Sequence, residues 1–147
     1  MGIRECIPYL HVNGAARAIA FYVEAFGAKE NYRLSEPSGR VGHAELDFGG
    51  TLVMLADEFP ELGFTGPSEG RLTTVTLHLH VDDADAAIAR AVAAGARVLR
   101  VPTTEFYGER SGRVRDPFGH EWSIGHEVEK VSPEEMQRRY TELLSPK

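Results

Sequence analysis

The chain has 147 residues, of which 42% are hydrophobic and 26% charged, with a formal net charge of −6. This composition is that of a folded globular domain and excludes disordered and collagen-like chains, and no apolar run approaches the roughly 18 to 20 residues that span a bilayer. The negative charge argues against nucleic acid and anionic membranes as partners, and the N-terminus lacks the features of a signal peptide. We therefore expect a cytoplasmic protein with a small-molecule ligand.

The first 57 residues predict a strand, a helix and three further strands. IPYLHV reads as a strand from Ile7, Asn13 is the expected helix cap, and apolar side chains then recur at helical spacing as far as Gly27. The next strands are expected at roughly 29–35, 40–48 and 51–57, with a Gly-Gly hairpin signal between the last two. This stretch is a βαβββ unit.

Residues 58–71 are rich in Gly, Pro and acidic residues and predict a linker. A second unit follows over 72–127, in which LTTVTLHLHV reads as a strand and Asp82 or Asp83 caps a helix. Its remaining strands are expected near 96–102, 110–115 and 120–127. The tail, 128–147, predicts a helix capped by Ser132, with an apolar stripe formed by Met136, Tyr140, Leu143 and Leu144.

An internal repeat relates the two units. Residues 7–56 recur weakly but in register 69 positions later, and DFGGTLVM from Asp47 matches DPFGHEWS from Asp116. One supersecondary unit was thus built twice. We predict an α+β fold in which two βαβββ modules form curved mixed sheets around a central cleft, with function in that cleft.

Alternation assigns the faces of the strands. In the strand 74–81, Val75, Leu77 and Leu79 point one way and pack under the helix, so His78 and His80 face the cleft. The 69-residue offset carries this assignment to the first unit. The predicted cleft floor is Ile7, Tyr9, His11, Met54, Thr76, His78, His80 and Ser123.

The helix motif AIAFYVEAFGA, the strand GRVGHAELDFGG and the stretch FYGERSGRVRDPFGHEW resemble the vicinal-oxygen-chelate superfamily. That superfamily comprises glyoxalase I, bleomycin-resistance proteins and extradiol dioxygenases, and the chain is most similar to its PhnB-like branch. The resemblance implies the duplicated fold and a homodimer. The resemblance is weak evidence for a particular function, because one fold hosts many chemistries.

The resemblance also implies where a metal would bind. Metal-dependent members place His or Glu ligands on the first and last strands of each unit, and those positions here are Ile7, Met54, Thr76 and Ser123. None of these is a usual ligand of a divalent metal, so we expect no cofactor and no metal at this set. The chain then resembles the metal-free antibiotic-binding members.

Two histidine pairs have open interpretations. His78 and His80 lie two residues apart on one strand face. They could be polar residues hydrogen-bonded in a wet groove, contacts to a ligand, or ligands of a metal ion. His43 and Glu45 share a strand face. The carboxylate could orient the imidazole as a general base, or both side chains could simply lie on a solvated sheet surface.

The loop between the expected strands 96–102 and 110–115 carries Phe106, Tyr107 and Arg110. The rings could cover a planar ligand and Arg110 could meet an anionic group, or Arg110 could pair with Asp116 or Glu109 to hold the loop. Trp122 is expected in the core. Cys6 is expected to be buried against the helix and inert, and as the only cysteine it excludes an internal disulfide.

The leading hypothesis is metal-independent binding of a small, planar organic molecule, as in antibiotic sequestration. Its predicted ligand-binding residues are Ile7, Tyr9, His43, Met54, Thr76, His78, Phe106, Tyr107, Arg110 and Ser123. The alternative is an enzyme of the superfamily, a lyase, isomerase or dioxygenase, that uses a non-standard metal site or metal-free acid/base catalysis. A regulatory domain that responds to a ligand is a third possibility.

Overall fold

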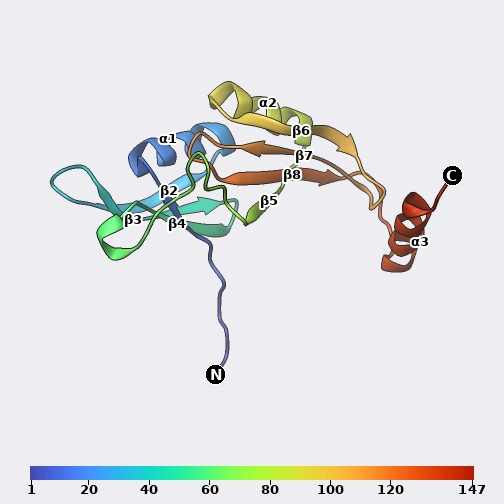
Figure 1. Cartoon of the computed structure of the whole chain (residues 1–147), viewed down its shortest axis with the longest axis horizontal. Coiled ribbons are helices and arrows are strands. Elements are labelled where there is room, and N and C mark those ends of the chain that lie inside the picture. Colours follow the sequence, from blue (N-terminus) through green and yellow to red (C-terminus); the bar gives the residue numbers. More distant parts are fainter.

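The computed structural model describes residues 1–147 and contains two four-stranded sheets, one formed by each half of the chain (Figure 1). The first module comprises β1 (Tyr9–Val12), α1 (Ala15–Phe26), β2 (Lys29–Ser35), β3 (Val41–Phe48) and β4 (Thr51–Asp57). The second comprises β5 (Thr76–His80), α2 (Ala84–Ala94), β6 (Arg97–Thr104), β7 (Glu109–Arg115) and β8 (Glu121–Glu127). A short 3-10 turn, Pro60–Leu62, lies in the linker, and α3 (Pro133–Leu144) ends the chain.

The two sheets have the same topology, which confirms the predicted α+β fold of duplicated βαβββ modules. Their strand orders are β1-β4-β3-β2 and β5-β8-β7-β6, with the first pair of each sheet parallel and the others antiparallel. A shift of 69 residues carries the register pair Tyr9–Met54 onto His78–Ser123. The repeat seen in the sequence is therefore a repeat of strand register as well.

Each sheet is covered by a helix on one face only. The helix α1 packs on the first sheet, α2 packs on the second, and the two helices contact each other (Figure 1). We call the face of each sheet that the helix does not cover the open face. Side-chain alternation decides which residues reach it, because neighbours along a strand point to opposite faces.

The helix starts are capped by different means, one of which differs from the sequence prediction. Asp83 accepts a hydrogen bond from Ala86 N at 3.2 Å, as expected for α2. Asn13 does not cap α1: the cap residue is Gly14, whose positive φ of 96° suits glycine, and Asp57 at the end of β4 accepts from the backbone N of Gly14 and Ala15. A carboxylate distant in sequence thus replaces the local cap.

The core joins the modules through one aromatic cluster. Trp122, fully buried as predicted, lies 4.9 to 5.4 Å from the rings of Tyr22, Phe26 and Phe48 of the first module. Asp116, only 4% exposed, accepts hydrogen bonds from the Tyr22 hydroxyl at 2.6 Å and from Trp122 Nε1 at 2.9 Å. Burial and this neighbouring carboxylate raise the pKa of Tyr22 well above its ordinary value. The two modules therefore share a single core.

Three local predictions were wrong. The first strand begins at Tyr9, so Ile7 precedes it; β5 begins at Thr76, and Val75 is 63% exposed instead of packing under the helix. Cys6 is exposed, because the extended segment that precedes β1 leaves the protein body (Figure 1). In each case the residue precedes the first paired residue of its strand, where alternation no longer fixes the direction of a side chain.

The tail helix α3 lies at the far end of the second module (Figure 1). Ser132 caps it as predicted, accepting from Glu135 N at 3.2 Å. Of its apolar stripe, Tyr140 stacks on Phe106, whereas Leu143 and Leu144 are more than 60% exposed. None of the helices is both long enough and apolar enough to span a bilayer.

Candidate functional site

The open face of the first module carries a group of ring side chains. Tyr9 and His11 alternate with buried Leu10 and Val12 on β1 and so reach this face, as predicted. The Tyr9 hydroxyl lies 2.8 Å from His43 Nδ1 on β3, and the His43 ring is 5.7 Å from that of Tyr32 on β2. Partial burial and the nearby Tyr32 raise the pKa of Tyr9. Three strands thus present aromatic surface with a hydrogen-bonding edge.

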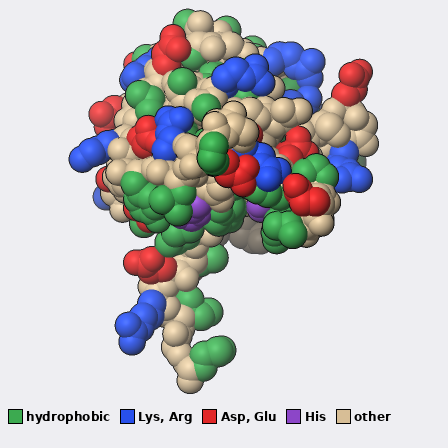
Figure 2. Space-filling model, turned by 90° about the vertical axis from the view of Figure 1, so that its left-hand side faces the viewer, with side chains coloured by type: hydrophobic (Ala, Val, Ile, Leu, Met, Phe, Trp, Pro, Cys, Tyr) green, Lys and Arg blue, Asp and Glu red, His purple; other side chains and the backbone are tan.

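The linker completes this face by folding back over it. Phe64 stacks on His11 with the rings 5.1 Å apart and nearly parallel, and Phe59 is held by the Arg40 guanidinium 3.9 Å above its ring. The open hollow that results has a volume of about 510 Å³ and is lined by Tyr9, His11, Glu36, Gly42, Ala56, Phe59, Leu62 and Phe64. Figure 2 shows hydrophobic and histidine side chains gathered on the lower part of the body, just above the N-terminal segment. We call the hollow lined by these eight residues the aromatic hollow.

The base of the first open face also contacts the second module. His120 is 92% buried, and its Nε2 lies 3.0 Å from the carbonyl oxygen of His11. Burial, and then the proximity of His120, lower the pKa of His11, although Glu58 opposes the effect. His11 is therefore held toward its neutral form, which favours ring stacking with Phe64 over solvation as a cation.

The open face of the second module is polar instead of aromatic. His78 Nδ1 lies 2.8 Å from Ser123 Oγ, and His80 Nε2 lies 2.6 Å from Glu109 Oε1. The second oxygen of Glu109 is 3.8 Å from His78 Nε2. Alternation predicted that His78, His80 and Ser123 would share this face. It did not predict that Glu109, the first residue of a strand two places away, would join them.

The loop residues have separate roles. Arg110 pairs with Asp85 at the start of α2, its Nε and Nη2 donating to the two carboxylate oxygens at 2.6 and 2.9 Å. Asp85 is neither of the two carboxylates that the sequence suggested as partners. Phe106 is covered by Tyr140 of α3. The Tyr107 hydroxyl lies 3.4 Å from Ser111 Oγ. Within one chain, these three residues contact the second module and the tail, and none lines the aromatic hollow.

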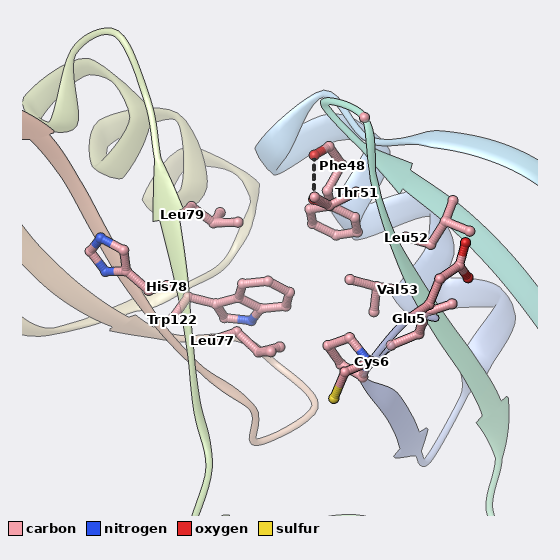
Figure 3. A pocket seen from close by; sticks show the side chains of 13 residues that line it. Glu5, Cys6, Phe48, Thr51, Leu52, Val53, Leu77, His78, Leu79 and Trp122 are labelled. Carbon is pink, nitrogen blue, oxygen red and sulfur yellow. Dashed lines mark hydrogen bonds between the residues drawn. The ribbon is translucent and has the colours of Figure 1, made fainter. Parts of the chain in front are cut away.

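An apolar hollow of about 330 Å³ lies at the edge of the shared core, between the modules and beside the N-terminal segment (Figure 3). It is lined by Leu77 and Trp122 of the second module and by Val53, Phe48 and Cys6 of the first (Figure 3). Ile7 lines this hollow and not the open face. This places Ile7 apart from Tyr9, whereas strand alternation predicted both on one cleft floor.

The predicted site residues thus form two groups. Tyr9, His43 and Met54 lie on the first sheet, and Thr76, His78 and Ser123 lie on the second. No hydrogen bond or ring contact joins Tyr9 to His78, the pair expected to face one another. Reasoning from the sequence missed Tyr32, Phe59, Phe64 and Glu109. The aromatic residues of the linker were a signal in the sequence, because a solvent-exposed linker has little use for them.

Comparison with known proteins identifies the family. The sequence profile described as the Glyoxalase/Bleomycin resistance protein/Dioxygenase superfamily matches residues 6–124. The chain belongs to this superfamily.

Several relatives support the assignment. An uncharacterized protein of Mycobacterium bovis is 45% identical over 134 residues, which cover 88% of each chain. The crystallised gene product At5g48480 of Arabidopsis thaliana has a TM-score of 0.65 at 30% identity, covering 84% of this chain and 98% of that one. The structure of TioX from a Micromonospora species is also similar, with a TM-score of 0.67 at 28% identity over 86% of this chain and all of the other.

The metal positions implied by the superfamily resemblance do not fit a divalent metal here. Met54 and Ser123 lie on the open faces, Thr76 begins β5, and Ile7 precedes β1. Aliphatic, thioether and hydroxyl side chains are poor donors to a hard or borderline cation, which binds imidazole and carboxylate groups. Ser123 moreover already has a partner in His78. These four residues therefore do not form a site for a divalent metal.

Proposed function

We propose that this superfamily member binds a small, largely planar organic molecule in its aromatic hollow, without a metal at the four superfamily positions. The observation that carries the proposal is the hollow itself. Its volume of about 510 Å³ lies within the usual range of small-molecule sites, roughly 300 to 1,000 Å³. Its walls are rings from two separate parts of the chain, β1 and the linker.

The chemistry of the walls selects the class of ligand. Phe64 and His11 present nearly parallel rings, and Tyr9 is 43% exposed, so flat faces remain available to a bound ring. An aromatic contact contributes about 0.5 to 1.5 kcal/mol beyond the burial of its area. The Tyr9 hydroxyl and Glu36 offer polar groups that orient a ligand. Binding and sequestration need nothing more, as the bleomycin-resistance part of the family description suggests.

The remaining predicted ligand residues would contact a ligand in the aromatic hollow if the protein is a homodimer. Phe106, Tyr107, Thr76, His78 and Ser123 lie on the second module, away from the aromatic hollow of the same chain. If two copies pair the first module of one chain with the second module of the other, these side chains come to face the hollow. A dimer of this kind would give the predicted aromatic lid without any change within the chain.

A thermal-shift screen of aromatic natural products, followed by calorimetry, tests the proposal. Stabilisation follows the ligand concentration relative to Kd, so a ligand at about 100 times its Kd contributes roughly 2.7 kcal/mol. For a ligand found in this way, Tyr9→Ala should weaken binding by about 1 kcal/mol or more, whereas Tyr9→Phe should retain the contribution of the ring. Unchanged affinity in Tyr9→Ala would refute the placement of the site.

A further inference from the structure

The open face of the second module brings three metal-binding side chains together. His78 and His80 lie on β5, and Glu109 begins β7; their donor atoms are all within 4.8 Å of one another. We propose that these three residues form a binding site for a divalent transition-metal ion such as Zn²⁺. The site is separate from the four superfamily positions, since none of its ligands is among them, and it goes beyond the proposed binding of a planar molecule.

The fold provides the space that lets Glu109 reach the histidines. The strand β8 lies between β5 and β7, and its Gly125 pairs with His80 on one side and with Ser111 on the other. A Cβ at Gly125 would lie 3.5 Å from His78 Cε1 and 3.0 Å from Ser111 Cβ. The absence of this side chain leaves the floor of the site clear, so that the carboxylate can approach both imidazoles across a strand.

The distances between the donor atoms of Glu109 and the two histidines are close to those between ligands of one metal ion. Glu109 contacts the two histidines through different oxygens, at 2.6 Å to His80 Nε2 and 3.8 Å to His78 Nε2. Two ligands about 2.1 Å from a tetrahedral Zn²⁺ are about 3.4 Å apart, which lies between these values. Side-chain rotations that bring the donor atoms, now all within 4.8 Å of one another, to this spacing would complete the set. The ion would take the place of the proton shared by His80 and Glu109.

Ser123 orients one of the ligands. Its Oγ lies 2.8 Å from His78 Nδ1, so the His78 tautomer protonated at Nδ1 donates to Ser123 and directs the Nε2 lone pair toward Glu109. Such a partner behind a histidine ligand fixes both its tautomer and its ring orientation. Ser123 thus acts as a positioning residue and does not itself ligate the ion.

The donor set and its exposure define the class of ion. Two imidazoles and one carboxylate suit borderline divalent ions such as Zn²⁺ or Co²⁺ better than Ca²⁺ or Mg²⁺, which prefer all-oxygen sites. The side chains of His78 and His80 are 38% and 70% exposed. An ion held here would therefore keep coordination positions open to water or to an oxygen atom of a ligand.

The test is Zn²⁺ titration of metal-free, untagged full-length protein by calorimetry, with Co²⁺ absorption as a second probe. We expect one Zn²⁺ per chain, at least tenfold weaker binding in His78→Ala, His80→Ala and Glu109→Gln, and a 10- to 100-fold loss in Ser123→Ala. Glu127→Gln is the matched control, because Glu127 pairs with Glu109 across β7 and β8 but lies outside the cluster. It should bind Zn²⁺ as the unmodified chain does.

The proposal is overturned if the unmodified chain does not bind Zn²⁺, or if His80→Ala and Glu109→Gln bind it unchanged. Circular dichroism of each variant verifies that the fold is intact, which the exposure of His80 favours. Failure of the metal site would leave the planar-ligand proposal standing, since that proposal depends on Tyr9 and the linker.

Discussion

Replacement of Asp116 by alanine tests how the two modules are held together. The carboxylate accepts four hydrogen bonds: from the Tyr22 hydroxyl, from Trp122 Nε1, and from the backbone N of Phe118 and His120, at 2.6 to 3.0 Å. Tyr22 belongs to the first module and the other partners to the second. Asp116→Ala therefore removes the one side chain that hydrogen-bonds both halves of the aromatic core.

The expected cost follows from the two side-chain donors that the substitution leaves unsatisfied. Tyr22 and Trp122 are both fully buried, so water cannot replace the lost acceptor. An unsatisfied buried donor costs about 1 to 3 kcal/mol, so the free energy of unfolding should fall by about 2 to 6 kcal/mol. The backbone donors of Phe118 and His120 belong to a turn and add less.

The repeat supplies a matched control. Asp47 occupies the equivalent position 69 residues earlier, and its carboxylate accepts from Gly50 N at 2.6 Å in an exposed turn. Asp47→Ala should therefore cost only about 0.5 to 1.5 kcal/mol. Urea unfolding, followed by the fluorescence of the single tryptophan and by circular dichroism, measures both values. Equal costs for the two variants would refute the role given to Asp116.

Three further predictions concern the faces, the titration and the assembly of the protein. Leu77→Ala should lower the free energy of unfolding by about 2 kcal/mol or more in denaturant melts, because Leu77 packs against the core, and Tyr9→Ala should cost less; the reverse order would mean that the faces are inverted. The lowered pKa of His11 means that the unfolded chain binds more protons there, so stability should fall as the pH drops through about 6.5 toward the folded pKa. His11→Gln should remove this part of the pH dependence, and a difference between the two proteins that is constant from pH 8 to 5 would contradict it. Light scattering should give the mass of a dimer, since Leu143 and Leu144 of α3 are exposed in the single chain, and a mass near 16 kDa at micromolar concentration would contradict this.

The sequence by itself determined the features that depend on local geometry. The repeat predicted two modules of one design, and the alternation along β5 placed Leu77 and Leu79 inward and His78 and His80 outward. Local caps were equally readable, because Asp83 and Ser132 bond backbone groups only three residues away. Strand and helix periodicities are fixed by the backbone, so a short window of sequence contains them.

Only the tertiary structure decided which side chains meet. Asp57 caps α1 from the end of β4, Phe64 of the linker stacks on His11, and Glu109 reaches His80 across an intervening strand. It also decided that Tyr9 and His78, although equivalent in the repeat, belong to two different groups within one chain. These contacts depend on strand order and on the path of the linker, and neither is encoded in the periodicity of any single segment.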